Sequence, residues 1–293
     1  MNVSRPDKVL FPDAGITKGD LAAHYERVAR PMLRHIKGRP ISMQRFPDGI
    51  GKQGFFHKEV PDHFPDWVKR VKVRKQGGTV THVLACDANT LVYLVDQACI
   101  TPHVWLSRSD ELERPDRLVF DLDPSNGSFA QVRAAARLLG ELLDSIGLAP
   151  FAMTTGSRGL HVWVPLRRQA VFDEVRQFAR DLARVMVERA PDELTLEARK
   201  QKRAGRILID IMRNGYAQTA VPPYAVRPRP GAPVATPLRW RELSDASLAP
   251  DKFTVRNIGR RLSRIGDPWE DIARHARTLG PARRRLDGLL GAA

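Results

Sequence analysis

Cysteine and long apolar runs are both scarce in this chain of 293 residues. Its two cysteines, Cys86 and Cys99, are too few for a disulfide framework and lack CxxC spacing, so we expect both to be reduced. No apolar run approaches the roughly 20 residues that span a bilayer, and the N-terminus lacks the apolar core of a signal peptide. The sequence therefore predicts a cytoplasmic protein with no membrane-spanning helix.

Acidic residues are also in short supply relative to basic ones. The chain has 48 Lys and Arg against 33 Asp and Glu, which gives a net charge of +15. Such an excess favours a polyanionic partner, either nucleic acid or an anionic membrane surface. An arginine-rich genome that places Arg on solvated faces would produce a similar excess. On charge alone, nucleic acid is the favoured partner.

Hydrophobic periodicity predicts helices interleaved with strands around a mixed sheet, which indicates an α+β or α/β class. One helix should be opened by a capping box of Thr17 and Asp20, and Pro31 would kink it. The expected helices cover 19–38, 128–147, 172–190 and 268–279. The expected strands cover 41–46, 79–86, 91–96, 117–123, 151–155, 160–166 and 206–212, with a proline-rich loop at 221–237 and a basic tail at 282–286.

The stretch RLVFDLDP contains two carboxylates one residue apart, Asp121 and Asp123. Side chains alternate across a strand, so both point to one face, and Pro124 then ends the strand. At about 5 Å their repulsion is on the order of 3 kcal/mol with an effective dielectric near 20. A divalent cation with oxygen ligands would offset it. A solvated strand end is the simpler alternative, and some glycosyltransferases also hold a metal–diphosphate with a DxD motif.

A third carboxylate lies in RILIDIMRN, where Asp210 interrupts an apolar strand. Burying an unpaired charge costs several kcal/mol, so Asp210 needs a partner. An arginine such as Arg213 is one explanation. If this strand neighbours the first, however, three carboxylates would form the two-metal arrangement used in phosphoryl transfer.

The stretch MTTGSRGLHVWVPL is typical of a turn that binds an anion, although it lacks the Walker A spacing. His161 follows the turn on the strand face opposite its apolar neighbours, where a single histidine could equally be structural. The turn itself combines two glycines, two hydroxyls and a guanidinium, which can approach a phosphate: Gly156, Gly159, Thr155, Ser157 and Arg158.

Seven motifs in the same order resemble the polymerase domain of bacterial DNA ligase D, an end-joining polymerase of the archaeo-eukaryotic primase superfamily. The resemblance covers about Arg5 to Leu243. It rests on RPDKVLFPDAGITKGD, RPISMQRFPDGIGKQGFFHKE, HVWLSR, RPDRLVFDLDP, TTGSRGLHVWVPL, ILIDIMRN and TAVPPYAVRPRPGAPVATPL. It implies an α+β, RRM-like mixed sheet flanked by helices, with an N-terminal accessory subdomain.

The resemblance also implies a role for each matching residue. Asp121, Asp123 and Asp210 would be catalytic and would bind two divalent cations, Mn²⁺ or Mg²⁺. The nucleotide-binding set would be His103, Thr155, Ser157, Arg158, His161, Arg203 and Arg227. Lys8 and Lys18 would bind a 5′-phosphate, and Phe55, Phe56, Arg45 and Lys58 would contact the template or DNA. Thr155 and Arg158 replace the usual Ser and the common Lys, and Gln44 and His57 also depart from the pattern.

We therefore expect a single primase-polymerase domain over 1–293, with an accessory portion over about 1–100, a catalytic core over 101–245 and a basic helical extension over 246–293. It would add NTPs or dNTPs, with ribonucleotides preferred, to a 3′-hydroxyl at DNA gaps or breaks carrying a 5′-phosphate. The resemblance suggests a nucleoid-associated location, with DNA and Ku as partners. A separate ATP-dependent ligase is a further suggested partner, because the chain shows no ligase signature. A non-catalytic nucleic-acid-binding module and a DxD glycosyltransferase are the alternatives.

Overall fold

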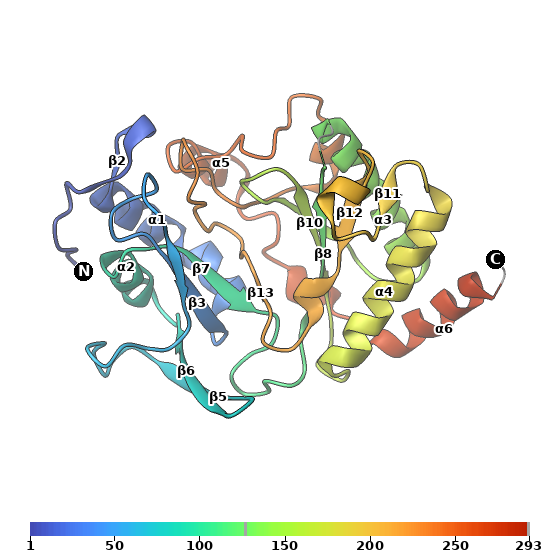
Figure 1. Cartoon of the computed structure of the whole chain (residues 1–293), viewed down its shortest axis with the longest axis horizontal. Coiled ribbons are helices and arrows are strands. Elements are labelled where there is room, and N and C mark those ends of the chain that lie inside the picture. Colours follow the sequence, from blue (N-terminus) through green and yellow to red (C-terminus); the bar gives the residue numbers. More distant parts are fainter. Residues whose placement is uncertain (126–127, 292–293) are drawn as a thin grey trace. The chain divides into compact units, whose positions relative to one another are not determined.

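The computed structural model describes residues 1–125 and 128–291, which form two compact units (Figure 1). Unit 1 comprises residues 1–112, 219–236 and 251–270, and unit 2 comprises residues 113–218, 237–250 and 271–293. The expected α+β class is confirmed, while the finer subdivision of the chain stays a prediction. Among the helices in the described part of the chain, none combines the length and apolarity needed to cross a bilayer.

Unit 1 is built on an antiparallel sheet in the order β13-β7-β3-β6-β5, with β4 paired to β3. A separate two-stranded ribbon, β1 with β2, precedes the first helix. The strands of unit 1 are β1 (Val9–Phe11), β2 (Ile16–Thr17), β3 (Pro40–Arg45), β4 (Phe55–His57), β5 (Arg70–Lys75), β6 (Gly78–Leu84), β7 (Cys99–Trp105) and β13 (Thr219–Ala220). Its helices are α1 (Lys18–Ile36), α2 (Ala88–Asp96) and α5 (Ile258–Ile265).

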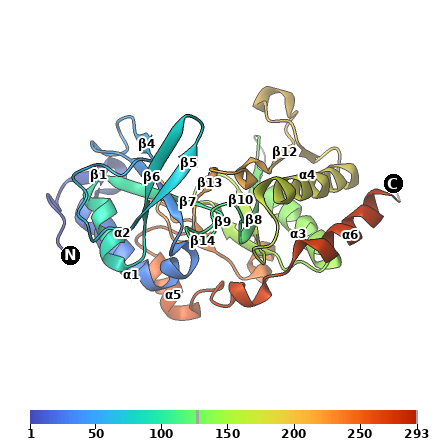
Figure 2. The same ribbon diagram turned by 90° about the horizontal axis from the view of Figure 1, so that it is seen from below.

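Unit 2 contains the second sheet, in the order β11-β12-β8-β10-β9-β14 (Figure 2). Helix α3 contacts β8, β10 and β12, and α4 contacts β8 and β11, so both helices pack on this sheet. The strands are β8 (Arg117–Asp123), β9 (Phe151–Thr154), β10 (Leu160–Pro165), β11 (Leu194–Thr195), β12 (Ile207–Asp210) and β14 (Thr236–Pro237). The helices are α3 (Phe129–Ser145), α4 (Phe172–Arg189) and α6 (Leu279–Leu290).

Helix α1 forms as its sequence predicts. The Thr17 hydroxyl accepts a hydrogen bond from the Asp20 amide, and the Asp20 carboxylate accepts one from the Thr17 amide, which completes the capping box. The helix continues through Pro31 to Ile36. Its apolar stripe is almost fully buried: Leu21, Tyr25, Val28, Met32 and Ile36.

The strand expected at 91–96 is wrong, because these residues belong to helix α2. Asp87 caps this helix by accepting a hydrogen bond from the Thr90 amide. Residues 90–95 are all buried, so the helix shows no polar face. A short apolar run of this kind cannot be assigned to a strand or a helix from periodicity alone. Asp87, a favoured helix-capping residue, is the sequence signal that could have identified the helix.

The C-terminal expectations are also corrected. Of residues 268–279, Ile272–His275 form only a short 3-10 turn, and Leu279 is already the first residue of α6. The basic stretch 282–286 is part of helix α6 instead of a tail. Ala282 and Leu286 are buried at a spacing of four residues, so α6 is held by packing on one side.

A buried histidine ties α1 to the proline-rich loop within unit 1. His24 is 1% exposed, and its Nε2 lies 3.0 Å from the Tyr224 carbonyl oxygen. Burial lowers the pKa of His24 to about 4, with a smaller contribution from the nearby Arg27 charge. The folded state therefore resists protonation of this ring, whereas an unfolded histidine titrates near 6.5.

We expect the contribution of His24 to the free energy of unfolding to be fully present above pH 6.5 and to be lost as the pH drops from 6.5 towards 4. The unfolded chain binds a proton in this range and the folded chain does not, which costs roughly 3 kcal/mol in total. Urea unfolding at both ends of the range should show a smaller acid loss in His24→Gln. The exposed His275, replaced in the same way, should keep the wild-type slope.

Candidate active site

Three neighbouring strands of unit 2 bring the predicted carboxylates together. Asp121 of β8 lies opposite Asp210 of β12 on one side and opposite His161 of β10 on the other. Residues directly opposite in an antiparallel pair point to the same face, and Asp123 shares that face because it is two residues from Asp121. The Cβ atoms of Asp121 and Asp210, and those of Asp121 and His161, therefore lie roughly 5 Å apart across the strands. Strands β8 and β12 are thus neighbours, which the sequence alone left open.

The other face of the same strands is apolar and completely buried. Phe120 and Leu122 of β8 and Val162 of β10 are inaccessible to solvent. The carboxylate face is more open, since Asp121, Asp123 and Asp210 are all partly exposed. Strand alternation therefore anchors the sheet on one side and presents acidic groups on the other.

A buried asparagine holds the end of β12 against β8. The side-chain oxygen of Asn214 accepts the Val119 amide at 2.8 Å, and its nitrogen donates to the Val119 carbonyl at 2.7 Å. The same nitrogen donates to the Ile211 carbonyl. Asn214 thus extends the ladder past the last residue of β12 and fixes Asp210 beside Asp121.

Basic side chains surround two of the three carboxylates. Asp123 accepts hydrogen bonds from Arg158 at 3.1 Å and from Arg203 at 3.0 Å. Asp121 lies 3.5 Å from His161 Nε2 and 4.0 Å from Arg213 Nε. The sequence named Arg213 as a partner for Asp210, but the ion pair that the structure shows is with Asp121.

Asp210 is held differently, by the amide of Met212 at 2.7 Å. No described Lys or Arg side chain forms a salt bridge with it. As the side chains are placed, no group of three His, Cys, Asp or Glu residues among those described is gathered tightly enough to hold a metal ion. The Asp123 carboxylate is instead bonded to its two arginines.

Arg203 is a fixed partner and Arg158 a freer one. The Arg203 side chain is buried and also donates to the carbonyls of Glu197 and Ala198, so its guanidinium is held at three points. The Arg158 side chain is about half exposed, at 51%. The sequence assigned both to nucleotide binding, and the structure brings both to Asp123.

The glycine-bordered turn lies between β9 and β10, at the end of β8. Gly156 adopts a φ of +63°, in the left-handed region. The Thr155 hydroxyl donates to the Gly159 carbonyl and accepts the Ser157 amide, so it closes the turn. A Cβ on Gly159 would lie 2.0 Å from the Leu122 carbonyl oxygen. Only glycine lets the turn approach the β8 backbone between Asp121 and Asp123.

The predicted nucleotide-site histidine His103 belongs to unit 1. It lies on β7 with Nε2 3.1 Å from Gln44 Oε1, and its ring packs edge-on against Phe56 at 5.1 Å. Gln44 pairs with Phe56 in the β3–β4 register, so these side chains share one face of the sheet. Phe56 is 57% exposed, which is unusual for a large apolar side chain.

The register separates the two adjacent phenylalanines. Phe55 pairs with Arg45 and therefore points to the opposite face from Phe56. The Arg45 guanidinium lies 5.7 Å from the Phe55 ring and also bonds His57 and the Gln97 carbonyl. Lys58, one residue beyond β4, is exposed.

The predicted triphosphate-contacting Arg227 lies in the proline-rich loop of unit 1. Its amide donates to the Pro233 carbonyl. The neighbouring Val226 accepts a hydrogen bond from Thr101 of β7, two residues before His103. The loop is therefore attached to the strand that carries the histidine.

The two predicted 5′-phosphate lysines lie side by side in unit 1. The Lys18 amide donates to the Lys8 carbonyl, because β1 and β2 pair directly ahead of α1. Lys18 is 5% exposed, and its ammonium bonds Asp96 and Ser4. Burial would raise the pKa of Asp96, but these hydrogen bonds lower it below its usual value.

Lys8 is the more accessible of the pair, and it forms a looser contact of 3.4 Å with the exposed Asp48. The first amides of α1 are already bonded within the chain, to the carbonyls of Lys8 and Pro6. Neither of these amides is therefore open to a phosphate. Asp96 went unnoticed in the sequence because it ends the segment that was expected to be a strand.

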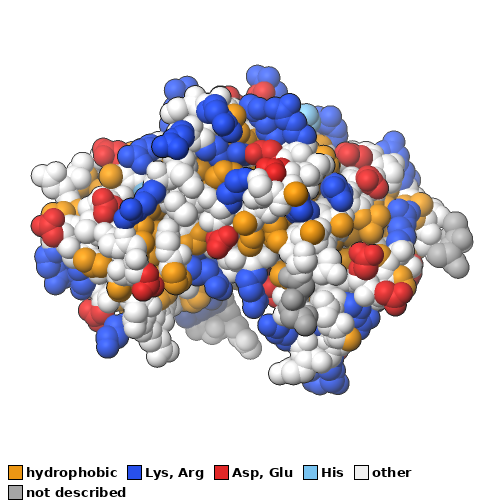
Figure 3. All heavy atoms as spheres, turned by 90° about the horizontal axis from the view of Figure 1, so that it is seen from above, with side chains coloured by type: hydrophobic (Ala, Val, Ile, Leu, Met, Phe, Trp, Pro, Cys, Tyr) orange, Lys and Arg blue, Asp and Glu red, His pale blue; other side chains and the backbone are white. Residues whose placement is uncertain are grey.

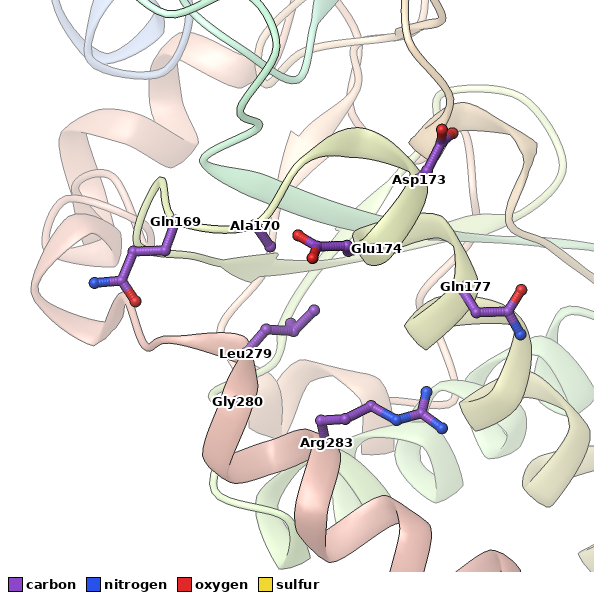
Figure 4. A pocket seen from close by; sticks show the side chains of 8 residues that line it. All are labelled: Gln169, Ala170, Asp173, Glu174, Gln177, Leu279, Gly280 and Arg283. Carbon is purple, nitrogen blue, oxygen red and sulfur yellow. The ribbon is translucent and has the colours of Figure 1, made fainter.

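A cavity of about 660 Å³ lies elsewhere in unit 2, between the start of α4 and α6 (Figure 4). Its acidic side chains do not belong to the strand carboxylates: Glu174 accepts the Val171 amide as part of the α4 cap. Arg283 at its edge is bonded to Asp181 and Asp287. The cavity is a hollow in the helical layer, made of residues separate from the candidate site.

Comparisons with known proteins agree with this architecture. The profile of the family described as "LigD, primase-polymerase domain" matches residues 17–269. The multifunctional non-homologous end joining DNA repair protein LigD of Mycobacterium tuberculosis is 35% identical over 281 residues, covering 93% of this chain and 37% of that protein. LigD of Pseudomonas aeruginosa is 32% identical over 291 residues, covering 98% of this chain and 34% of that protein. The chain thus spans about a third of the length of these curated relatives.

A solved structure is similar over nearly its whole length. The polymerase domain of M. tuberculosis ligase D, in complex with DNA, matches with a TM-score of 0.89 and 33% identity, over 94% of this chain and 99% of that one. These matches define the class as a primase-polymerase type of DNA/RNA nucleotidyltransferase. The chain belongs to the LigD primase-polymerase domain family. The family resemblance seen in the sequence is confirmed, and the glycosyltransferase alternative is not supported.

Gly159→Ala should destabilise unit 2 by several kcal/mol and disorder the carboxylate strand, because the added methyl collides with the Leu122 carbonyl. Thermal unfolding of the purified protein measures the loss. Gly280→Ala in α6 is the matched control, since its Cβ would lie no closer than 3.9 Å to any neighbour. An unchanged melting temperature in Gly159→Ala would show that the turn is not packed as described.

Proposed function

We propose that the chain is a metal-dependent, DNA-templated nucleotidyltransferase that adds nucleotides, preferably ribonucleotides, to a 3′-hydroxyl at gaps or break ends carrying a 5′-phosphate. The observation that carries this proposal is the placement of Asp121 opposite both Asp210 and His161, beside the glycine-bordered turn. The names of the relatives support a role in non-homologous end joining. Ku and a separate ATP-dependent ligase would act with it at the same ends.

The donor set fits divalent cations. Asp121, Asp123 and Asp210 offer carboxylate oxygens, which Mg²⁺ and Mn²⁺ prefer, and their mutual repulsion would be offset by bound cations. His161 is 4% exposed, and its Nδ1 has no hydrogen-bond partner among the described residues. Two such ions, when bound, stabilise charge on the attacking and leaving oxygens of an in-line displacement.

The arginines around Asp123 would then take different roles. Arg158 is exposed enough to leave Asp123 and bind a triphosphate with its two-pronged guanidinium. Arg203 is buried and held by two carbonyls, so it would stay in place and orient Asp123. Arg203 is thus a positioning residue for the carboxylate, in contrast to the nucleotide contact expected from the sequence.

Unit 1 would supply contacts to the nucleotide and the template. His103 and Arg227 would bind the nucleotide, and the exposed Phe56 would stack on a base, a contact that tolerates any sequence. Phe55 lies on the opposite sheet face and would contact a different part of the DNA, with Arg45 and Lys58 nearby in the chain. The excess of basic side chains would bind the phosphate backbone of the DNA.

Asp121→Asn with Asp123→Asn should reduce primer extension by a factor on the order of 10³ or more, because the oxygens that hold the cations lose their charge. The assay is extension of a gapped, 5′-phosphorylated duplex with Mn²⁺, with NTPs and dNTPs compared. Mn²⁺ binding, followed by the paramagnetic signal of the free ion, should fall in parallel.

The matched control is Asp173→Asn with Asp192→Asn, which removes two exposed carboxylates of unit 2 outside the site. It should extend primers like the wild type. If the wild type extends no primer with either nucleotide set but still binds the duplex, the chain is a binding module and the catalytic proposal is wrong. Faster extension with dNTPs would contradict the ribonucleotide preference alone.

Lys8→Ala should lower the affinity for a gap with a 5′-phosphate by about 10-fold, towards the affinity for a 5′-hydroxyl gap, because one charge-assisted contact is lost. Lys8 is the cleaner test, since removing Lys18 would leave the partly buried Asp96 without its cationic partner. Fluorescence anisotropy on the two gaps measures the ratio. Lys37→Ala, an exposed lysine after α1, is the control; equal losses on both gaps would argue against a 5′-phosphate contact.

A further inference from the structure

The segment 252–265, which includes helix α5 of unit 1, contains five basic residues and no acidic one. Arg260 and Arg264 are four residues apart on α5 and therefore lie on the same face of the helix. Like charges at this spacing destabilise a helix by roughly 0.2–0.5 kcal/mol per pair. Their clustering is thus a cost that a neighbouring anion would remove.

These arginines are not neutralised within the protein. Arg256, Arg260 and Arg264 form no salt bridge with any acidic side chain among the described residues. Elsewhere in unit 1 an exposed arginine does find such a partner, as Arg34 does with Glu270. Arg256, Arg260 and Arg264 are therefore available to a ligand from outside the chain.

A hollow of about 180 Å³ opens beside α5. At its base the Arg261 guanidinium lies 4.4 Å from the centre of the Phe253 ring, and Arg261 is only 8% exposed. This stacking fixes the base of the hollow, beside the more exposed arginines of α5. The hollow is lined by Lys252, Phe253, Asn257, Arg260, Arg261 and Arg264.

Helix α1 extends the same basic surface. A Cβ on Gly259 would lie 3.0 Å from Cδ of Arg27, so α1 and α5 touch at this point. Arg27 is exposed and has no salt bridge with a described acidic residue. It lines a second hollow, of about 400 Å³, together with Arg256. Asp20 also borders this hollow, but its carboxylate is bonded to the Thr17 amide.

We propose that this α5 arginine surface binds the phosphate backbone of duplex DNA, as a second contact made of residues other than the catalytic carboxylates and the Lys8–Lys18 pair. It consists of Arg27, Arg256, Arg260 and Arg264, and Lys252 and Arg261 line the hollow next to it. Guanidinium groups match phosphate oxygens two at a time, and such contacts position a protein on DNA without reading sequence. The space-filling view shows how widely Lys and Arg side chains are distributed on one face of the molecule (Figure 3).

An anionic membrane is the less suitable partner. A helix that binds a membrane surface presents a large apolar face. Ile258 of α5 is fully buried, and none of the large, exposed apolar side chains in the described residues belongs to this helix. The α5 arginine surface offers charge without apolar area, which suits a phosphate backbone.

The test is the triple variant Arg27→Gln, Arg260→Gln and Arg264→Gln. The probe is a short, labelled blunt duplex without 5′-phosphates, followed by anisotropy from about 50 to 200 mM salt with no nucleotide and no metal. The slope of log K against log salt should become shallower by about 2–3, because each phosphate contact contributes about 0.9. Affinity near 0.1 M salt should fall about 10-fold or more.

The matched control removes three exposed, unpaired arginines from the helices of unit 2: Arg137→Gln, Arg189→Gln and Arg284→Gln. It has the same net charge and should keep the wild-type slope. A wild-type slope in the α5 variant, or an equal change in the control, would overturn the proposal. So would loss of binding to phosphatidylserine vesicles with DNA binding intact. Since the measurement contains no nucleotide, a failure of the proposed catalysis would leave its result unaffected.

Discussion

The candidate site depends on one pairing register, which places Asp121 of β8 opposite Asp210 of β12. Like charges directly opposite destabilise a sheet, and two carboxylates about 5 Å apart repel by roughly 3 kcal/mol at an effective dielectric of 20. The strand pair therefore forms only because its other face is apolar and fully buried, and because Asn214 fastens its end. Stability elsewhere in the sheet supports an arrangement that is unfavourable in itself.

The arginine side chains that offset this repulsion also affect what the site can bind. Arg203 is buried and tied to two carbonyls, so its charge is permanently assigned to Asp123. Arg158 is half exposed and has a single strong contact, so a competing anion can attract it. A site that contains acids and movable arginines together can accept cations on its carboxylates and phosphate on its guanidinium groups, which is what a metal-bound triphosphate requires.

Strand periodicity was enough to predict that Asp121 and Asp123 would share one face, because alternation is a local property. Which strands become neighbours is a long-range property, and the sequence supplied it only through resemblance to a family. Partners such as Arg203 for Asp123, 80 residues apart, could not be inferred from pattern. The segment at 91–96 failed for a different reason: burial on all sides removes the polar face by which a helix is recognised.

The net charge of +15 is not evenly available to a partner. Around the carboxylates, Arg158, Arg203 and Arg213 are matched by acids, so this region contributes little to attraction at a distance. The α5 segment has no acid within it, and its Arg256, Arg260 and Arg264 form no salt bridge with a described acidic residue. Under the two proposals, long-range attraction of DNA and close recognition of a nucleotide would be carried by different arginines. The affinity for DNA could then change with ionic strength while the geometry at Asp121 stays fixed.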